Sequence, residues 1–583
     1  MTLVTRGAVT ASPPPVGVLA WACVLAPALL IGSLVYRYGV DVPYWDEWVI
    51  AGLLQQVDQG TLTVRDIFAQ HNEHRPAVQR LVQLAQASLG GWKMRAMMAL
   101  TQLLLLAMLA GCVLLWRHGR CSARPWGVAP LAITALLVFT PAQHQNLFWA
   151  FQFCFLMPSA GLLAGTVAAA SPRLSLGAAL AWAAVGATLA TFSLLAGILI
   201  WPLSALAVML MRGVPTRGTL RPWLLWTATA AAVLGAYFHG YAAPTNSPSI
   251  LNTLKQPLIL VGGYFACLGS AFGLGAAPVP RATTAIVSGV AGVMTYLWLV
   301  LRAWRMRDRI DPRQTAPWIV MGLFALAAGA AITVGRIGYG LGTVFEPRYC
   351  SITIWLFVAC VMLAARAQGA VPGRPMVPVQ VVAPVVLMLS VAAYPFHVRA
   401  ITTSYRERLA AQAVYTFAEV APKGWPNIPA ELDASQWTYL TSVLQQIERT
   451  GWRQPRPTAP AWVEATAAAS DCRFGVVEDR LDVRGRVMAD GWAYLPGARR
   501  PADAVLATTG ADRRLVGLAP LATGRVDVRE RFGLRAVPIS GWFFDMTLKT
   551  AAPPLRFWAL DVTRLEAYPL CLPASAVQAA TER

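Results

Sequence analysis

Apolar segments long enough to cross a lipid bilayer recur along the first two thirds of the chain. A helix needs about 20 residues to cross the hydrocarbon core, and the run from about residue 16 to 38 already reaches that length. Hydrophobic residues make up 56% of the 583-residue chain and charged residues only 13%. Soluble globular proteins are much less apolar. The sequence therefore predicts an all-α polytopic membrane domain.

About eleven transmembrane helices are expected in this domain. They are predicted at about residues 16–38, 94–116, 127–142, 150–170, 175–192, 195–211, 222–242, 283–304, 317–334, 350–366 and 377–394. Arginines cluster in four connecting loops, and such loops are retained in the cytoplasm. The N-terminus is then cytoplasmic and the C-terminal region extracytoplasmic. Residues 258–277 are also apolar, and we predict an interfacial or re-entrant helix there.

The composition divides the chain into five parts. These are a disordered cytoplasmic tail (1–15), the transmembrane domain with its outer loop 39–93 (16–394), a helical extracytoplasmic linker (395–468), a β-sandwich domain (469–575) and a short tail (576–583). Between Cys472 and Cys571 short β-like runs alternate with Gly, Pro and Asp, a pattern typical of a small antiparallel sandwich. In an extracytoplasmic domain the two cysteines would form a disulfide.

The charge balance points to membrane lipids as partners. The formal net charge is +20. No basic, aromatic-studded soluble domain accompanies it, so nucleic acid is not an expected partner. Basic residues that face the anionic cytoplasmic leaflet account for the excess. The chain is predicted to be a multi-pass protein of the bacterial inner membrane.

A short polar island, Tyr44-Trp45-Asp46-Glu47-Trp48, follows the first apolar run. Tryptophan favours the membrane interface, and a carboxylate there can act as a general base on a sugar hydroxyl. Asp46 and Glu47 are therefore the candidate catalytic residues. The alternative is that one of them only caps the amphipathic helix that follows.

A second island in the same loop reads His71-Asn72-Glu73-His74-Arg75-Pro76. Pro76 suits the first turn of an in-plane amphipathic helix over 77–89. Arg75 would face the positive end of that helix, which a bound phosphate would explain. His71 and Glu73, together with His74, could hold a divalent metal ion. The alternative is a solvated polar loop.

A third cluster lies far down the chain, where Arg336 ends one apolar run and Glu346-Pro347-Arg348-Tyr349 precedes the next. Two arginines and a tyrosine at one interface suit phosphate binding, and snorkelling to lipid head groups is the alternative. Two minor candidates for a sugar pocket are 143–146 with Trp149 and Gln152, and 192–197. Ordinary helix ends would explain them equally.

Together these motifs resemble the GT-C superfamily of membrane glycosyltransferases, and are similar to those of the lipid A aminoarabinose transferases and protein O-mannosyltransferases. Trp45-Asp46-Glu47-Trp48, His74-Arg75-Pro76 and Arg348-Tyr349 stand in the places of the family's acidic, basic and Arg-Tyr motifs. The second motif differs from the Lys-Pro-Pro of the aminoarabinose transferases. The resemblance covers roughly residues 16–394 and implies a GT-C-like fold, a polyprenyl-phosphate sugar donor and transfer with inversion.

These observations predict an inverting glycosyltransferase that moves a sugar from a polyprenyl-phosphate donor to a glycan, lipid or protein acceptor at the outer face of the inner membrane. Asp46 is the candidate base. His74, Arg75, Arg336, Arg348 and Tyr349 are the candidate substrate-binding residues. A flippase for lipid-linked sugars would need ionisable groups near the midplane, and the span centres contain almost none. A non-catalytic subunit of a cell-envelope glycan assembly complex is the third possibility.

Overall fold

The chain divides into two compact units, each of which is described by itself. The computed structural model describes residues 17–118, 128–244, 254–275, 277–368, 377–420, 434–463, 472–483, 486–510, 512–547 and 555–571. The first unit comprises Met1–Gly39, Thr63–Gln83 and Ala96–Ile401, and the second comprises Val40–Leu62, Leu84–Arg95 and Thr402–Arg583. The predicted tails 1–15 and 576–583 lie outside the described residues, and the other predicted domain boundaries stay predictions.

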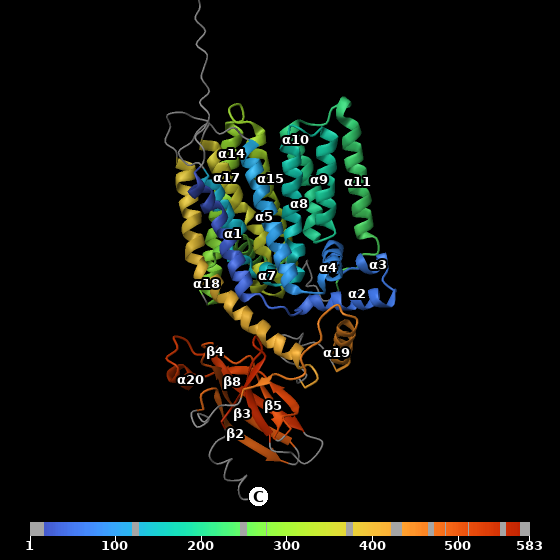
Figure 1. Cartoon of the computed structure of the whole chain (residues 1–583). Coiled ribbons are helices and arrows are strands. Elements are labelled where there is room, and N and C mark those ends of the chain that lie inside the picture. The colour runs from blue at the N-terminus through green and yellow to red at the C-terminus, as the bar shows by residue number, and fades with distance from the viewer. Residues whose placement is uncertain are drawn as a thin grey trace, which may run out of the picture. The chain divides into compact units, whose positions relative to one another are not determined.

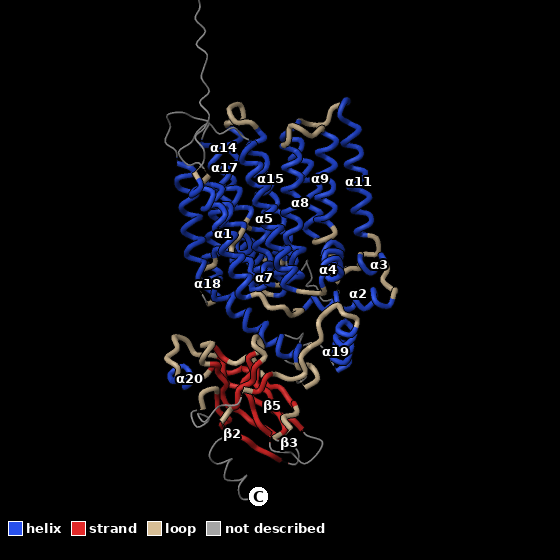
Figure 2. The backbone as a smooth tube through the Cα atoms, in the orientation of Figure 1, coloured by secondary structure: helices blue, strands red, loops and turns tan. Residues whose placement is uncertain are grey.

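Helices make up the first unit (Figures 1 and 2). The helices that lie mainly in it are α1 (Val18–Tyr38), α3 (Val64–Ile67), α5 (Met94–His118), α6 (Ala129–Val138), α7 (His144–Phe148), α8 (Phe153–Ala170), α9 (Leu176–Thr191), α10 (Ile200–Arg212), α11 (Leu220–Phe238), α13 (Pro257–Leu268), α14 (Pro278–Arg305), α15 (Pro312–Arg336), α16 (Cys350–Thr353), α17 (Trp355–Gln368) and α18 (Val377–Thr416). The predicted all-α polytopic membrane domain is confirmed.

Eight helices among the described residues are long and apolar enough to span a membrane, so the expected number of about eleven is not confirmed. They are Val18–Tyr38, Met94–Arg117, Ala150–Ala170, Leu195–Arg212, Pro278–Arg305, Pro312–Tyr339, Pro347–Arg366 and Val379–Thr416. The shorter apolar helices Leu176–Thr191 and Pro257–Leu268 fall below that length. The run predicted at 127–142 forms only the ten-residue α6, because Pro141 lies close behind it and cannot continue the helix.

Close approach of two backbones fixes the packing of α8 against α9. A Cβ atom on Gly161 would lie 2.4 Å from the main-chain oxygen of Gly186, and one on Gly186 would lie 2.6 Å from that of Gly161. Small residues at such a crossing let membrane helices pack through their backbones. This pair fixes the middle of α8, whose first turn carries a residue of the site described below.

Two arginines tie helix ends together in the first unit. The guanidinium of Arg212 donates to the main-chain oxygens of Ala169 (2.8 Å) and Ala168 (3.0 Å) at the end of α8. The buried Arg366 donates to the main-chain oxygen of Trp116 (2.6 Å) near the end of α5. Cationic side chains stabilise the carbonyl-rich end of a helix.

The second unit contains the strands (Figure 2). They are β1 (Ala461–Trp462), β2 (Gly475–Val483), β3 (Arg486–Leu495), β4 (Arg500–Pro501), β5 (Ala504–Thr509), β6 (Leu515–Ala519), β7 (Leu521–Gly524), β8 (Ile539–Thr547), β9 (Leu555–Asp561) and β10 (Glu566–Pro569). One sheet has the order β1-β10-β9-β5-β6, and the other has β2-β3-β8-β7 with β4 paired to β3. The predicted C-terminal β-rich region is confirmed.

The two sheets share one apolar core, as in a β-sandwich. Trp542 and Phe544 of β8 are buried with Val505 of β5 and Phe557 of β9, whereas Phe543, between the two buried β8 residues, is 57% exposed. This alternation follows from the two-residue period of a strand. The unit also contains the helices α2 (Trp48–Gln59), α19 (Ala434–Arg449) and α20 (Val526–Arg531), and α4 (Ala77–Gly90) runs from the first unit into the second.

The predicted disulfide between Cys472 and Cys571 is present. The two Cα atoms are 5.2 Å apart across a sequence separation of 99 residues, a spacing in the usual range for a disulfide. Cys571 also forms a parallel bridge with Val476 of β2. The bond therefore joins the two ends of the β-domain.

Candidate active site

A tight turn in the first unit presents the polar side chains of the second island. The main-chain N–H of His71 donates to the oxygen of His74 (2.7 Å), and the N–H of His74 donates back to His71 (2.9 Å). Asn72 has a φ of 50°, a left-handed conformation that asparagine tolerates better than most residues. The turn leaves the Glu73 carboxylate between the His74 ring and Arg336, the last residue of α15.

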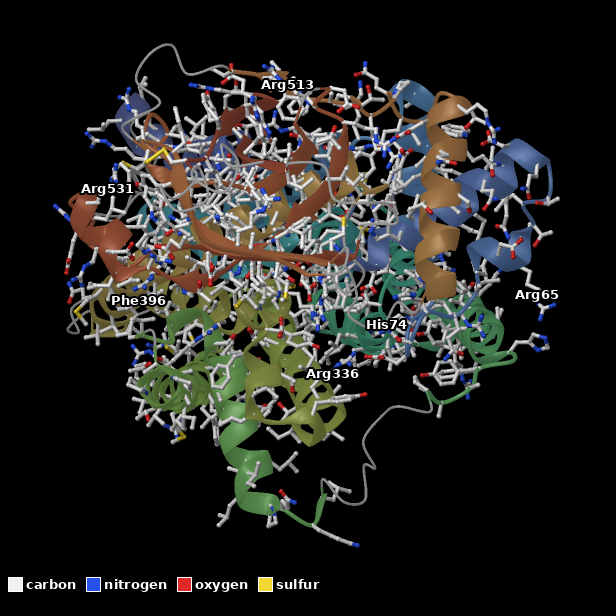
Figure 3. The ribbon with its side chains drawn as sticks, turned by 90° about the horizontal axis from the view of Figure 1, so that it is seen from below. Arg65, His74, Arg336, Phe396, Arg513 and Arg531 are labelled. Carbon is white, nitrogen blue, oxygen red and sulfur yellow. A yellow bond between two sulfur atoms is a disulfide. The ribbon has the colours of Figure 1, made fainter. Side chains whose placement is uncertain are left out.

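Glu73 and Arg336 form an ion pair, with His74 beside them. An Oε1 of Glu73 contacts Nη2 of Arg336, the last residue of α15, and lies 3.5 Å from Nε2 of His74. Figure 3 labels His74 and Arg336, which lie close together when the molecule is seen from below. The side chains of Glu73 and Arg336 are 21% and 25% exposed, so this pair is accessible to a ligand.

The hydrogen bond to Nδ1 of His74 decides which ring nitrogen carries the proton when the ring is neutral. The main-chain N–H of Leu195 donates to Nδ1 of His74 at 3.2 Å. In a neutral ring the proton must then be on Nε2, which faces Glu73. This contact joins the segment 192–197, one of the two minor candidates for a sugar pocket, to the site.

Arg75 holds the loop in place. Its Nε donates to the main-chain oxygen of Tyr237 (2.7 Å), Nη1 to that of Phe68 (2.8 Å) and Nη2 to that of His239 (2.8 Å). Three of its five N–H donors are therefore used by backbone carbonyls. These bonds hold the loop, and the phosphate-binding role expected from the position of Arg75 before α4 stays a prediction.

The polar face of α4 is buried. Arg80, 3% exposed, donates through Nη1 to the main-chain oxygen of Ile67 (2.9 Å) and caps the end of α3. Burial lowers the pKa of Arg80 to about 10. Gln79 donates to the main-chain oxygen of Ala150 (2.9 Å), whereas Leu81 is 50% exposed. The predicted helix over 77–89 is present as α4, with its polar residues directed at the protein.

The segment before α8 fixes the third cluster. Nε2 of Gln145 donates to the Glu346 carboxylate at 2.8 Å. Nδ2 of Asn146 donates to the main-chain oxygen of Arg348 at 2.9 Å. These bonds connect residues about 200 positions apart, so the two candidate segments that the sequence offered separately belong to one site.

Phe155 of α8 lies at the centre of three candidate residues. Its ring centroid is 6.3 Å from the ring of His74, 5.9 Å from that of Tyr349 and 6.0 Å from Cζ of Arg348. The arginine lies over the ring face, as in a cation–π contact. Sequence reasoning missed Phe155, because a phenylalanine in an apolar span carries no signal that separates it from the core.

The metal expectation for His71 and Glu73 stays a prediction. The ring of His71 lies 5.2 Å from that of Phe151, and Glu73 is paired with Arg336. Within the described ranges, no three His, Cys, Asp or Glu side chains form a group that could hold a metal ion.

Asp46 and Glu47 belong to the second unit, where their environments differ. The carboxylate of Glu47 is 1% exposed and accepts the main-chain N–H of Tyr44 at 2.7 Å. The buried guanidinium of Arg408 attracts it electrostatically. The Glu47 side chain thus caps the short turn Trp45–Glu47 and makes no cap bond to α2. The role of general base stays a prediction for Asp46.

The turn around Asp46 is conformationally strained. Trp45 has a φ of 48° and is 40% exposed. A bulky residue in the left-handed region is an outlier that costs about 1–3 kcal/mol, and such outliers cluster at functional sites. Asp46 itself is half-buried.

Comparisons with known proteins were made for the whole chain. No protein-family model matches it, and no curated protein matches it. Solved structures do match it. The chain is similar to ArnT.

The apo-state crystal structure of ArnT from Cupriavidus metallidurans is 14% identical, with a TM-score of 0.39 over 73% of this chain and 88% of that chain. The ArnT structure bound to undecaprenyl phosphate is 14% identical, with a TM-score of 0.40 over 74% and 89%.

Proposed function

We propose that this protein is a glycosyltransferase of the inner membrane that moves a sugar from a polyprenyl-phosphate donor to a glycan, lipid or protein acceptor. The observation that carries the proposal is the gathering of His74, Arg348 and Tyr349 around Phe155, with Arg336 joined to His74 through Glu73. These residues come from four separate segments, and all lie at the ends of apolar helices or in the loops between them. Such a gathering suits an anionic lipid head group.

Arg336 and Arg348 are proposed to neutralise the departing phosphate. When the bond between the sugar and the phosphate breaks, negative charge grows on the leaving oxygen, and fixed cations lower the energy of that state. Guanidinium groups suit this role because they can bind a phosphate through two parallel hydrogen bonds. Arg336 contacts the Glu73 carboxylate, an oxygen anion of the kind that a phosphate would supply.

Asp46 is proposed as the general base. It would take the proton of the acceptor hydroxyl as that oxygen bonds to the anomeric carbon. The carbon–oxygen bond to the phosphate breaks on the opposite face, so the configuration at the anomeric carbon inverts and polyprenyl phosphate leaves. No metal ion is needed to balance this step.

Buried amide groups favour a hydroxyl-bearing ligand near the arginines. The side-chain oxygens of Gln143, Gln145, Asn146 and Gln152 are buried, and among the described residues none of them accepts a hydrogen bond. Sugar hydroxyls and water are both donors that would suit these acceptors. This supports the sugar-pocket prediction for the segment 143–152.

The test is turnover by the purified full-length protein in lipid nanodiscs with a panel of polyprenyl-phosphate sugars and candidate acceptors. We expect release of polyprenyl phosphate and transfer of the sugar with at least one donor. Movement of a lipid-linked sugar across a liposome bilayer without any transfer would instead support the flippase.

The proposed orientation has the N-terminus in the cytoplasm and the C-terminal region outside, because arginine-rich loops favour the cytoplasm. A C-terminal alkaline phosphatase fusion should then be active. A fluorescent C-terminal green fluorescent protein fusion with an inactive phosphatase fusion would reverse the assignment.

A further inference from the structure

The loop that carries Asp46 is built into the C-terminal part of the chain. Residues 40–62 form one compact unit with residues 402–583, although these segments are separated by the whole membrane domain in sequence. Three sets of contacts within the second unit hold this loop.

Apolar contacts anchor the start of the loop. Val40 and Val42 are 4% and 3% exposed, and they belong to the same buried cluster as Leu409 of α18, Leu506 of β5 and Trp558 of β9. The β-domain and the end of α18 therefore bury the two residues that lead into the Tyr44–Glu47 turn.

Aromatic and polar contacts anchor the part that follows the turn. The ring of Trp48 lies 6.2 Å from that of Trp92 and 6.4 Å from that of Tyr415. Side-chain hydrogen bonds then tie α2 to the C-terminal helices and the loop behind them. They run from Nε2 of Gln55 to Oε1 of Gln446 (2.8 Å) and from Nε1 of Trp452 to Oδ1 of Asp58 (2.7 Å).

A buried charge pair holds the turn itself. Glu47 and Arg408 are 1% and 3% exposed, and their charges attract each other. The guanidinium of Arg408 also lies over the ring of Tyr44, 5.1 Å from its centroid. A buried charge is costly unless it is paired, so Arg408 fixes where Glu47 lies. Trp45 and Asp46 lie in the sequence between Tyr44 and Glu47, the two residues with which Arg408 interacts.

We propose that the C-terminal region, residues 402–583, is the scaffold that positions Asp46, and that Arg408 is the positioning residue, acting through Glu47 and Tyr44. The C-terminal region would then contribute to the active site itself, which a separate ligand-binding domain would not do. This inference rests on the proposed function only in taking Asp46 as the base.

The experiment compares Arg408→Met with Arg486→Met in the full-length protein. Arg486 pairs with Asp545 on the exposed surface of the same region, and exposed pairs contribute little, so it is the matched control. Hydrogen exchange of peptides covering residues 44–50 is measured alongside peptides of α8. Turnover is measured at saturating donor and as a function of donor concentration.

We expect exchange at 44–50 to become at least about tenfold faster in Arg408→Met, with α8 unchanged, because the turn loses its buried partner. Turnover at saturating donor should fall at least about tenfold while the apparent KM for the donor changes by less than about twofold. Arg486→Met should match the wild type. In the double variant Glu47→Gln/Arg408→Met the turn still lacks Arg408, so exchange at 44–50 should stay at least about threefold faster than in the wild type; a full return would assign the effect to the unpaired Glu47 charge and overturn the proposal.

Unchanged exchange at 44–50 in folded Arg408→Met overturns the proposal, as does a loss of activity confined to the apparent KM. If Arg408→Met does not fold, Glu47→Gln breaks the same pair from the loop side, and the same two outcomes decide. If the wild type transfers no sugar, the proposed function fails, and the exchange measurement still decides whether the scaffold exists.

Discussion

Asp46 and Glu47 are adjacent carboxylates for which the same chemical change should have opposite consequences. Asp46→Asn and Glu47→Gln each remove one negative charge and keep the shape of the side chain. Glu47 is buried and accepts the main-chain N–H of Tyr44, whereas Asp46 is half-buried in the strained turn. The comparison therefore separates catalysis from folding within two residues of chain.

The expected magnitudes follow from these environments. Glu47→Gln removes the strongest of the negative charges that attract the buried guanidinium of Arg408 and leaves Glu407, so the change should cost up to about 3–5 kcal/mol. This is a large part of the roughly 5–15 kcal/mol that stabilises a folded domain. Asp46→Asn breaks no buried charge pair of this kind, so its free energy of unfolding should stay within about 0.5 kcal/mol of the wild-type value. Loss of a general base should lower its turnover by roughly 10²- to 10⁴-fold.

Both variants are assayed in nanodiscs for thermal unfolding and for turnover with the donor that the wild type uses. Asp46→Asn should unfold like the wild type and be nearly inactive. Glu47→Gln should unfold earlier and keep measurable turnover below its unfolding temperature. Near wild-type turnover in Asp46→Asn, in protein that unfolds at the wild-type temperature, would refute the base assignment.

Further measurements probe other parts of the structure. Arg348→Ala should raise the apparent donor KM and lower the rate together, because a phosphate contact is lost while Asn146 still holds the main chain; a change in neither contradicts the phosphate role. Cys472→Ala should leave Cys571 as a free thiol in mass spectrometry and destabilise the β-domain by up to about 4.7 kcal/mol, the chain-entropy value for a loop of about 100 residues; an unchanged β-domain shows that the bond is dispensable. Burial raises the pKa of Asp503 to about 6 although Arg500 donates to it. Because the folded-state pKa is raised from 3.8, Asp503 favours the folded state at low pH and this contribution is lost as pH rises through about 6. The free energy of unfolding of the wild type, relative to that of Asp503→Asn, should therefore increase by up to about 3 kcal/mol as pH falls from 7 to 4, measured by hydrogen exchange of β5. A difference that is constant, or that increases toward pH 7, contradicts the burial argument.

Features written in local sequence were predictable. The helix at Ala77–Gly90 was expected from its apolar period after Pro76, and the long spans from their length and composition. Cys472 and Cys571 could be paired because they stand alone at the two ends of a β-like region. The polar cluster with Glu73 and His74 also marked a segment that contacts Arg336, a residue that the sequence had singled out separately.

Features that depend on contacts across hundreds of residues were not predictable. Arg75 looked like an anion site because its neighbours in sequence make a helix start, but its actual partners, such as the carbonyls of Tyr237 and His239, come from the end of α11. Glu47 resembled Asp46 in every local respect, and only the distant Arg408 separates them. Phe155 belongs to the candidate site because it contacts His74, Arg348 and Tyr349, and no sequence periodicity connects these residues.

The arginines at helix ends change how the net charge of this protein should be understood. Arg75, Arg80, Arg212 and Arg366 each donate to main-chain carbonyls, so their positive charge is matched by local dipoles. Less of the +20 charge is then available to anionic lipids or to counter-ions than the sequence suggests. Lysine would conserve the charge at these positions but not the fork of donors. A homologue with lysine there would need another way to close the same helix ends.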